Sequence, residues 1–324
     1  MIIRILGALL LTILAAGPSH ASVPAEETMM ATHVPWAIGG PRIEVDGELV
    51  DRAPEWPQES IRAIRLWDTR TAWLHLEPAR GSFDWSNLDR HLAQAERHGV
   101  QHITLVVWGT PSWAADSAAA TDAHWLGPGS ASPPKDLADW QLFVRTLAER
   151  YRGRIHAYEI GNEPTEPMFW RGTDDQLSAM ITSAAVAIRS ADPQATVLAP
   201  IEASIPAGTV DALAFHWYPL PGTNPKDLQA FVWQIRAQRA RAGQENLPLW
   251  LTEVNLRPGN RSRGQQLSDI AAVNRAAQRA GLAYLAWYAW TDQLAPEFMD
   301  LRQPGALAAT LRISNARAAD SEFN

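Results

Sequence analysis

Two glutamates in this sequence stand where a strand should end. Glu163 follows the bulky, alternating segment 155–160 and is followed by Pro164. Because proline has no N–H for a strand ladder, the strand must stop there. Glu253 ends a second apolar run, which begins at Leu249. Two carboxyl groups held together can supply a proton donor and a nucleophile, which is the chemistry of glycosidic bond hydrolysis.

Tryptophan is unusually frequent in this chain. The 324 residues include 15 Trp against 5 Tyr and 7 Phe. Indole rings fill hydrophobic cores, but they also stack on the apolar C–H faces of sugars. The sequence leaves both uses open, and together with the paired glutamates it suggests a glycosidase.

The elements that must position these residues alternate between strand and helix. Strands are predicted over residues 34–43, 61–68, 100–108, 155–160, 196–201, 211–215, 247–253 and 283–290, and helices over 86–98, 135–151, 174–189, 226–241 and 265–279. Such alternation predicts a single-domain (β/α)8 TIM barrel over residues 22–324, in which catalytic groups lie at the carboxyl ends of the strands. The segment 202–210 is too short for a crossover helix, so the barrel should be reduced at the fifth crossover. Gly-rich dinucleotide and phosphate-binding motifs are absent, which disfavours a doubly wound sheet.

The first 21 residues predict a cleaved export signal. Arg4 precedes an apolar run over residues 5–16, and Ser19-His20-Ala21 forms a small-x-small cleavage site. The run is too short for a stable membrane anchor, so we expect a periplasmic or secreted protein. A formal net charge of −7 argues against a nucleic-acid partner.

The residue types also bear on cofactors. The chain has no cysteine, which removes thiolate chemistry and disulfides, and its nine histidines show no metal-ligand spacing. We therefore predict neither a cofactor nor a catalytic metal, and we expect a polysaccharide or oligosaccharide partner.

Six motifs in one order resemble the clan A glycoside hydrolases, of the family 39 type found in bacterial exopolysaccharide hydrolases. They are the pattern from Arg65-Leu66-Trp67-Asp68 to Phe83-Asp84-Trp85, the loop 109–114, Asn162-Glu163-Pro164, His216-x-Tyr218, Thr252-Glu253 and Trp287-Tyr288-Ala289-Trp290. The resemblance covers most of the mature chain. Two departures stand out: Gly161 replaces a tryptophan of many relatives, and there is no room for the appended β-sandwich of the family's xylosidases.

The resemblance implies a role for each motif. Glu163 would be the acid/base and Glu253 the nucleophile of a retaining double displacement, with their carboxyl groups about 5 to 5.5 Å apart. Asn162 would bind the sugar hydroxyl beside the anomeric carbon, while His216 and Tyr218 would lie near the nucleophile. Trp287 or Trp290 would floor the subsite.

Each assignment has an alternative. Glu159 shares strand parity with Glu163 and could instead be a buried partner of Arg65, whereas Glu166 and Glu245 should be rim or turn residues. His216 could be a packed histidine. Arg65 and Trp67 lie on the same face of their strand, because side chains alternate along it, and this face is the inward one if the two faces are assigned correctly.

Alternatives also remain for the other tryptophans and for the protein as a whole. Trp108 and Trp113 could belong to the core or to the cleft. A non-catalytic carbohydrate-binding barrel and a structural protein with a decayed site are the competing functions. Residues from Gln303 onward show no readable chemistry.

Overall fold

The computed structural model describes residues 29–33, 43–45, 48–50, 56–67, 69–116, 126–220, 222–290 and 297–312. The predicted signal segment lies outside these residues. Within them, no helix combines the length and apolar character needed to cross a membrane.

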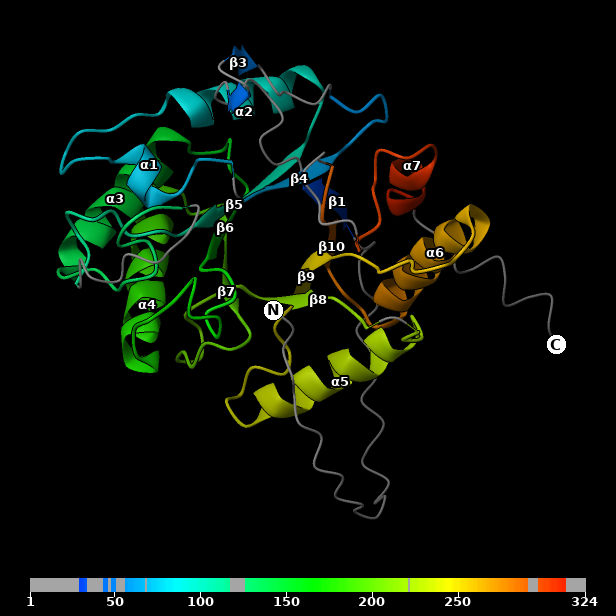
Figure 1. Cartoon of the computed structure of the whole chain (residues 1–324). Coiled ribbons are helices and arrows are strands. Elements are labelled where there is room, and N and C mark those ends of the chain that lie inside the picture. Colours follow the sequence, from blue (N-terminus) through cyan, green and yellow to red (C-terminus); the bar gives the residue numbers. More distant parts are fainter. Residues whose placement is uncertain are drawn as a thin grey trace.

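Eight parallel strands close into a barrel, with helices packed around it (Figure 1). The strands are β1 (Met29–His33), β4 (Ala63–Leu66), β5 (His102–Val107), β6 (Ala157–Ile160), β7 (Thr196–Pro200), β8 (Ala212–Trp217), β9 (Leu249–Val254) and β10 (Tyr284–Trp287). Neighbours in the chain are neighbours in the barrel, and β1 closes it by pairing with both β4 and β10. The predicted (β/α)8 fold is confirmed.

The first strand lies earlier in the chain than the sequence pattern predicts. The prediction of a barrel strand over residues 34–43 is wrong, because Met29–His33 takes that position and pairs Ala31 with Ala63. Residues 34–42 lie outside the described part. Ile43 instead begins β2 (Ile43–Val45), which forms a two-stranded antiparallel sheet with β3 (Glu48–Val50) outside the barrel. The short β1 has only one β-branched residue, Thr32, and no Phe, Tyr or Trp, so it lacks the enrichment that identifies the other strands.

The helices are α1 (Trp73–Leu76), α2 (Ser86–Arg97), α3 (Leu137–Arg150), α4 (Asp174–Ala191), α5 (Asp227–Ala240), α6 (Arg263–Arg279) and α7 (Ala306–Thr310). Capping boxes fix the starts of α4 and α6, where Thr173 and Ser262 accept from the backbone of the third helical residue. The described part of the tail after Gln303, which ends at residue 312, contains one helix, α7, which contacts α6.

Side-chain alternation decides which residues reach the barrel axis. Small residues and a stacked aromatic pair fill the interior: Ala63, Ala157, Leu198, Ala212, Ala214, Ala286, and Trp250 on Tyr284 with ring centroids 4.5 Å apart. Because side chains alternate along a strand, positions two residues further on also point inward. Arg65 follows Ala63 in this way, and Glu159 follows Ala157. The polar residues of the site therefore lie next to this interior cluster, on the side of the carboxyl ends of the strands.

The described crossover between β7 and β8 contains no helix, in agreement with the sequence. Ala203 and Ile205 of this connection are buried. Their carbonyl oxygens accept hydrogen bonds from Arg239, at the end of α5, and from Gln244, just beyond it, both at 3.0 Å. A neighbouring helix thus fixes the backbone of the short crossover.

Candidate active site

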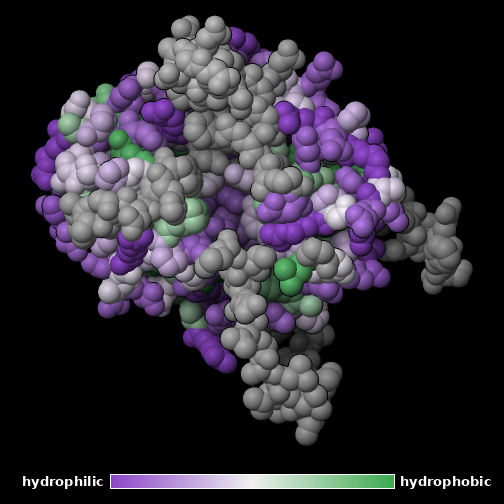
Figure 2. Space-filling view, in the orientation of Figure 1, coloured by the Kyte–Doolittle hydropathy of each residue, from purple (hydrophilic) through white to green (hydrophobic). Residues whose placement is uncertain are grey.

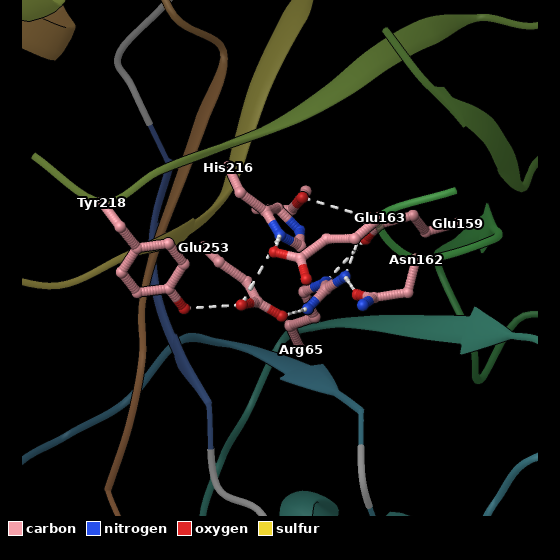
Figure 3. Close-up of polar contacts among 8 residues, drawn as sticks. Arg65, Glu159, Asn162, Glu163, His216, Tyr218 and Glu253 are labelled. Carbon is pink, nitrogen blue, oxygen red and sulfur yellow. Dashed lines mark hydrogen bonds and ion pairs between the residues drawn. The ribbon is translucent and has the colours of Figure 1, made fainter. Parts of the chain in front are cut away.

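A buried arginine holds the lower layer of the site together. Nε and Nη2 of Arg65 donate to the two carboxylate oxygens of Glu159 at 2.6 and 2.9 Å, and Nη1 donates to Oε1 of Glu253 at 2.7 Å (Figure 3). Nη2 also reaches Oδ1 of Asn162 at 3.2 Å, and Thr252 donates to Glu159 at 3.0 Å. Burial lowers the pKa of Arg65, but Glu159 and Glu253 outweigh it and raise the pKa, so the guanidinium stays charged.

Replacing this arginine should destabilise the protein strongly. Arg65→Met leaves Glu159 and Glu253 buried without their cation, and we expect the free energy of unfolding to fall by about 3–5 kcal/mol. Urea denaturation measures this difference. Arg80→Met is the matched control, because Arg80 pairs with Asp139 at the surface and its side chain is 66% exposed. The control should cost less than about 1 kcal/mol, and an equally small effect at both positions would contradict the role given to Arg65.

Glu163 projects from a turn with unusual backbone geometry. Its φ is +41°, in the left-handed region that residues other than glycine rarely adopt. Such a conformation costs about 1–3 kcal/mol and occurs preferentially at functional sites. Gly161, two residues earlier, has φ +103°, and a Cβ there would come within 3.2 Å of the Trp108 ring. The glycine that replaces the tryptophan of many relatives is therefore required by the path of this turn.

Both oxygens of Glu253 are engaged by the protein. Oε1 accepts from Arg65, and Oε2 accepts from the hydroxyl of Tyr218 at 2.6 Å. The residue is 5% exposed. Burial and the charge of Glu253 raise the pKa of Tyr218, so its hydroxyl remains a donor. These contacts orient the carboxylate towards the cavity and stabilise its anionic form.

His216 lies between the two glutamates but is closer to Glu163. Nδ1 is 2.8 Å from Oε1 of Glu163 and 3.6 Å from Oε2 of Glu253. The sequence placed this histidine beside the presumed nucleophile. His216 follows Ala212 and Ala214 on the inward face of β8, and a shift of register between Phe215 and His216 pairs it with Glu253 of β9.

The histidine and Glu163 perturb each other. Burial lowers the pKa of His216, but the charges of Glu253 and Glu163 and the hydrogen bond to Glu163 raise it overall. Burial raises the pKa of Glu163, yet the hydrogen bond and charge of His216 and the charge of Arg65 lower it overall. In the free protein the two groups thus form an ion pair that holds one proton on the imidazole.

The separation of the two glutamates limits the chemistry. One oxygen from Glu163, one from Glu253 and a His216 nitrogen lie within 4.8 Å of one another. Retaining glycosidases hold their carboxyl groups about 5–5.5 Å apart, whereas inverting enzymes need about 6.5–9.5 Å to admit a water. The three atoms could also surround a cation, but Arg65 and Tyr218 already supply partners for Glu253.

The predicted tryptophans fall into two groups. Trp67 and Trp108 are buried. The rings of Trp67 and Phe169 pack edge to face with centroids 5.8 Å apart, and Nε1 of Trp108 donates to the Phe169 carbonyl at 2.9 Å. Trp113 and Trp290 are half-buried and retain surface that a ligand can reach. Trp113 also packs against Trp73 and donates to the Glu77 carbonyl.

Trp287 does not form the floor of the sugar-binding subsite. It lies one residue after the inward-facing Ala286, is fully buried, and donates from Nε1 to Asn274 of α6 at 3.1 Å. Strand alternation therefore places its ring between the barrel and the helix layer. Of the two tryptophans predicted for this role, only Trp290 remains a candidate.

The space-filling view is hollowed near the centre of the face shown, and hydrophilic residues line the hollow (Figure 2). Sequence reasoning did not consider Glu202, which lies two residues after the end of β7. Glu202 could have been identified from its position close after a strand end, because the same criterion had identified Glu163 and Glu253.

Comparison with known proteins bears on the fold and on the class of enzyme. A family model for Glycosyl hydrolase family 10 matches residues 67–196, a stretch that contains Glu163 and stops before Glu253. No curated protein sequence matches the chain.

Solved structures show the same fold at low sequence identity. A glucosidase from Croceicoccus marinus superposes with a TM-score of 0.62 and 17% identity, covering 82% of this chain and 60% of that one. A family 39 glycoside hydrolase from Bacteroides cellulosilyticus WH2 gives 0.52 and 16%, with coverage of 73% and 52%. Endo-glycoceramidase II from Rhodococcus sp. gives 0.54 and 17%, with coverage of 89% and 78%. The chain thus spans about three-fifths or less of the first two proteins.

These matches do not single out family 39, since the family model is that of family 10. The partial family match, the barrel and the paired glutamates together support a glycosidase among the clan A glycoside hydrolases.

Proposed function

We propose that this protein is a retaining glycoside hydrolase that cleaves a polysaccharide by double displacement. The observation that carries the proposal is the close approach of the two strand-end glutamates, whose oxygens lie within 4.8 Å. This spacing suits direct attack by a carboxylate on the anomeric carbon and leaves no room for a water between carboxylate and sugar.

Glu253 is the nucleophile in this proposal. Its contacts with Arg65 and Tyr218 keep it anionic and directed at the substrate. Attack forms a covalent bond between Glu253 and the anomeric carbon as the bond to the leaving oxygen breaks. Water then attacks the anomeric carbon from the face that the leaving group had occupied, and the bond to Glu253 breaks. The second inversion restores the original configuration, so the anomeric configuration is retained.

Glu163 is the acid and then the base. The leaving oxygen needs a proton, which the resting site holds on His216 at 2.8 Å from Glu163. Transfer of this proton to Glu163 keeps the net charge of the pair unchanged, and Glu163 then donates it to the leaving oxygen. In the second step Glu163 accepts the proton of the attacking water.

The remaining contacts of the proposal concern the sugar. Asn162 is buried and its Oδ1 accepts from Arg65, which orients the amide so that its nitrogen can donate to the hydroxyl beside the anomeric carbon. Trp290, which is half-buried, is proposed as a stacking surface. We further propose that the substrate is an exopolysaccharide or related glycan of the family 39 type, met outside the cytoplasm. The export signal that the sequence predicts for residues 1–21 is the reason for proposing this location.

Product analysis tests the proposal. The mature protein is incubated with the host's exopolysaccharide and, for comparison, with xylan, and the products are sized. Proton NMR of the earliest products then reports the configuration of the new reducing end. We expect shortening of one polymer with retained configuration. Inverted products would contradict the double displacement, and binding without cleavage would instead favour the non-catalytic carbohydrate-binding barrel.

A further inference from the structure

Glu202 occupies a catalytic-end position that the proposed mechanism does not use. It follows β7, the strand that lies between β6, which leads to Glu163, and β8, which carries His216. The charges of His216 and Glu163 also act on Glu202. Glu202 therefore lies on the side of the acid/base, where the leaving group of the substrate must be.

The backbone on both sides of Glu202 is held firmly. The N–H of Ile201 donates to the Ala214 carbonyl at 2.8 Å, and the N–H of Ala203 donates to the Pro200 carbonyl at 3.0 Å. Arg239 donates to the Ala203 carbonyl from the end of α5. These bonds fix where the side chain of Glu202 begins, as is required of a residue that recognises a ligand.

The carboxylate itself has no side-chain partner among the described residues. Glu202 is exposed to solvent, and the only hydrogen bond assigned to it is from its own backbone N–H. The nearby cation, Arg239, is 9% exposed and directs its hydrogen bonds to Ala203 and Gln244 instead. Desolvation by the surrounding protein, together with the charge of Glu163, raises the pKa of Glu202.

The charges of the site favour a cationic ligand. With all groups ionised, the carboxylates of Glu159, Glu163, Glu202 and Glu253 exceed the cations Arg65, His216 and Arg239 by one. An ionised carboxylate can only accept hydrogen bonds, so an ammonium group is its best complement. A neutral hydroxyl group would donate a hydrogen bond to the carboxylate but would not compensate the excess negative charge of the site.

We propose that Glu202 forms a leaving-group subsite that recognises the protonated amine of an amino sugar. The inference rests on the proposed glycosidase function, because it assigns the substrate of the same site. The substrate class is then a glycan that contains unacetylated hexosamine residues.

Binding measurements test this subsite without relying on turnover. Isothermal titration compares chitosan oligosaccharides with their fully N-acetylated counterparts, at a pH below the pKa of the sugar amine. We expect the charged series to bind about fivefold more tightly, as for one solvent-accessible ion pair, and the advantage to shrink as salt is added. Glu202→Gln should remove this advantage while leaving the affinity for the acetylated series unchanged.

Glu149→Gln on α3 is the matched control, since it removes the same charge from an exposed position outside the barrel. Its binding should match that of the unaltered protein. Equal affinity for both series, no binding of the charged series, or an equal loss in both variants would overturn the inference. Covalent labelling of Glu253 by a 2-fluoro glycoside reports separately on the glycosidase function, so failure of the two proposals can be distinguished.

Discussion

Glu253→Gln is expected to lower kcat by on the order of 10⁶-fold, the scale seen when a catalytic nucleophile is removed. The amide is nearly isosteric with the carboxylate, so the loss reports missing nucleophilic chemistry rather than a change of shape. Turnover of an aryl glycoside measures the effect. Mass spectrometry of the unaltered protein after treatment with a 2-fluoro glycoside should find the sugar on the peptide that contains Glu253.

Two controls accompany this variant. Glu245→Gln changes the charge of a half-buried glutamate shortly before β9, at the amino end of the strand, and should leave kcat within about twofold because the site lies at the opposite, carboxyl end of the barrel. Circular dichroism of Glu253→Gln checks the fold, since Arg65 loses one anionic partner. Substantial activity in a folded Glu253→Gln protein would remove the residue from the nucleophile's role.

Glu163→Ala is expected to lower kcat/KM by about 10²–10⁴-fold on substrates with poor leaving groups, because their departure depends on protonation. An aryl glycoside whose leaving group needs no proton should form the glycosyl-enzyme at a nearly normal rate. The second step should then be slow, and azide should restore it, since this small anion can replace water without needing a base. Stopped-flow measurement of the aryl burst separates the two steps.

Glu166→Gln is the matched control for Glu163→Ala, because Glu166 lies in the same turn and its N–H donates to the Glu163 carbonyl. It should keep near-normal activity on both kinds of substrate. An equal loss on good and poor leaving groups in Glu163→Ala, with no effect of azide, would show that the residue has a structural role only.

The barrel and the meeting of its polar residues follow from simple rules of chain geometry. The predicted ends of the strands located Glu163 and Glu253 at one end of a barrel. The alternation of side chains along each strand suggested that Arg65 and Glu159 both face the barrel interior. The structure pairs these two side chains through two hydrogen bonds. Alternation works here because each strand is regular over the residues concerned.

The errors arose where a local pattern was weak or where a motif was followed without regard to strand alternation. His216 lies within 3.6 Å of Glu253, near the nucleophile as expected, but its shorter contact with Glu163 was not foreseen. Trp287 was assigned to the site from its motif, although Ala286 faces inward and the next residue must face the helices. The left-handed φ of Glu163 depends on tertiary contacts and leaves no signal in a single sequence.

The short first strand has a consequence for the integrity of the barrel. β1 is the only described strand that joins β4 to β10, and its five residues begin at Met29. A chain truncated to residue 34, where the sequence pattern alone would start the fold, would expose the backbone donors and acceptors of two facing edges at once. Unpaired edges recruit strands from other molecules. The residues of β1 therefore protect the protein against aggregation, although none of them belongs to the proposed catalytic site.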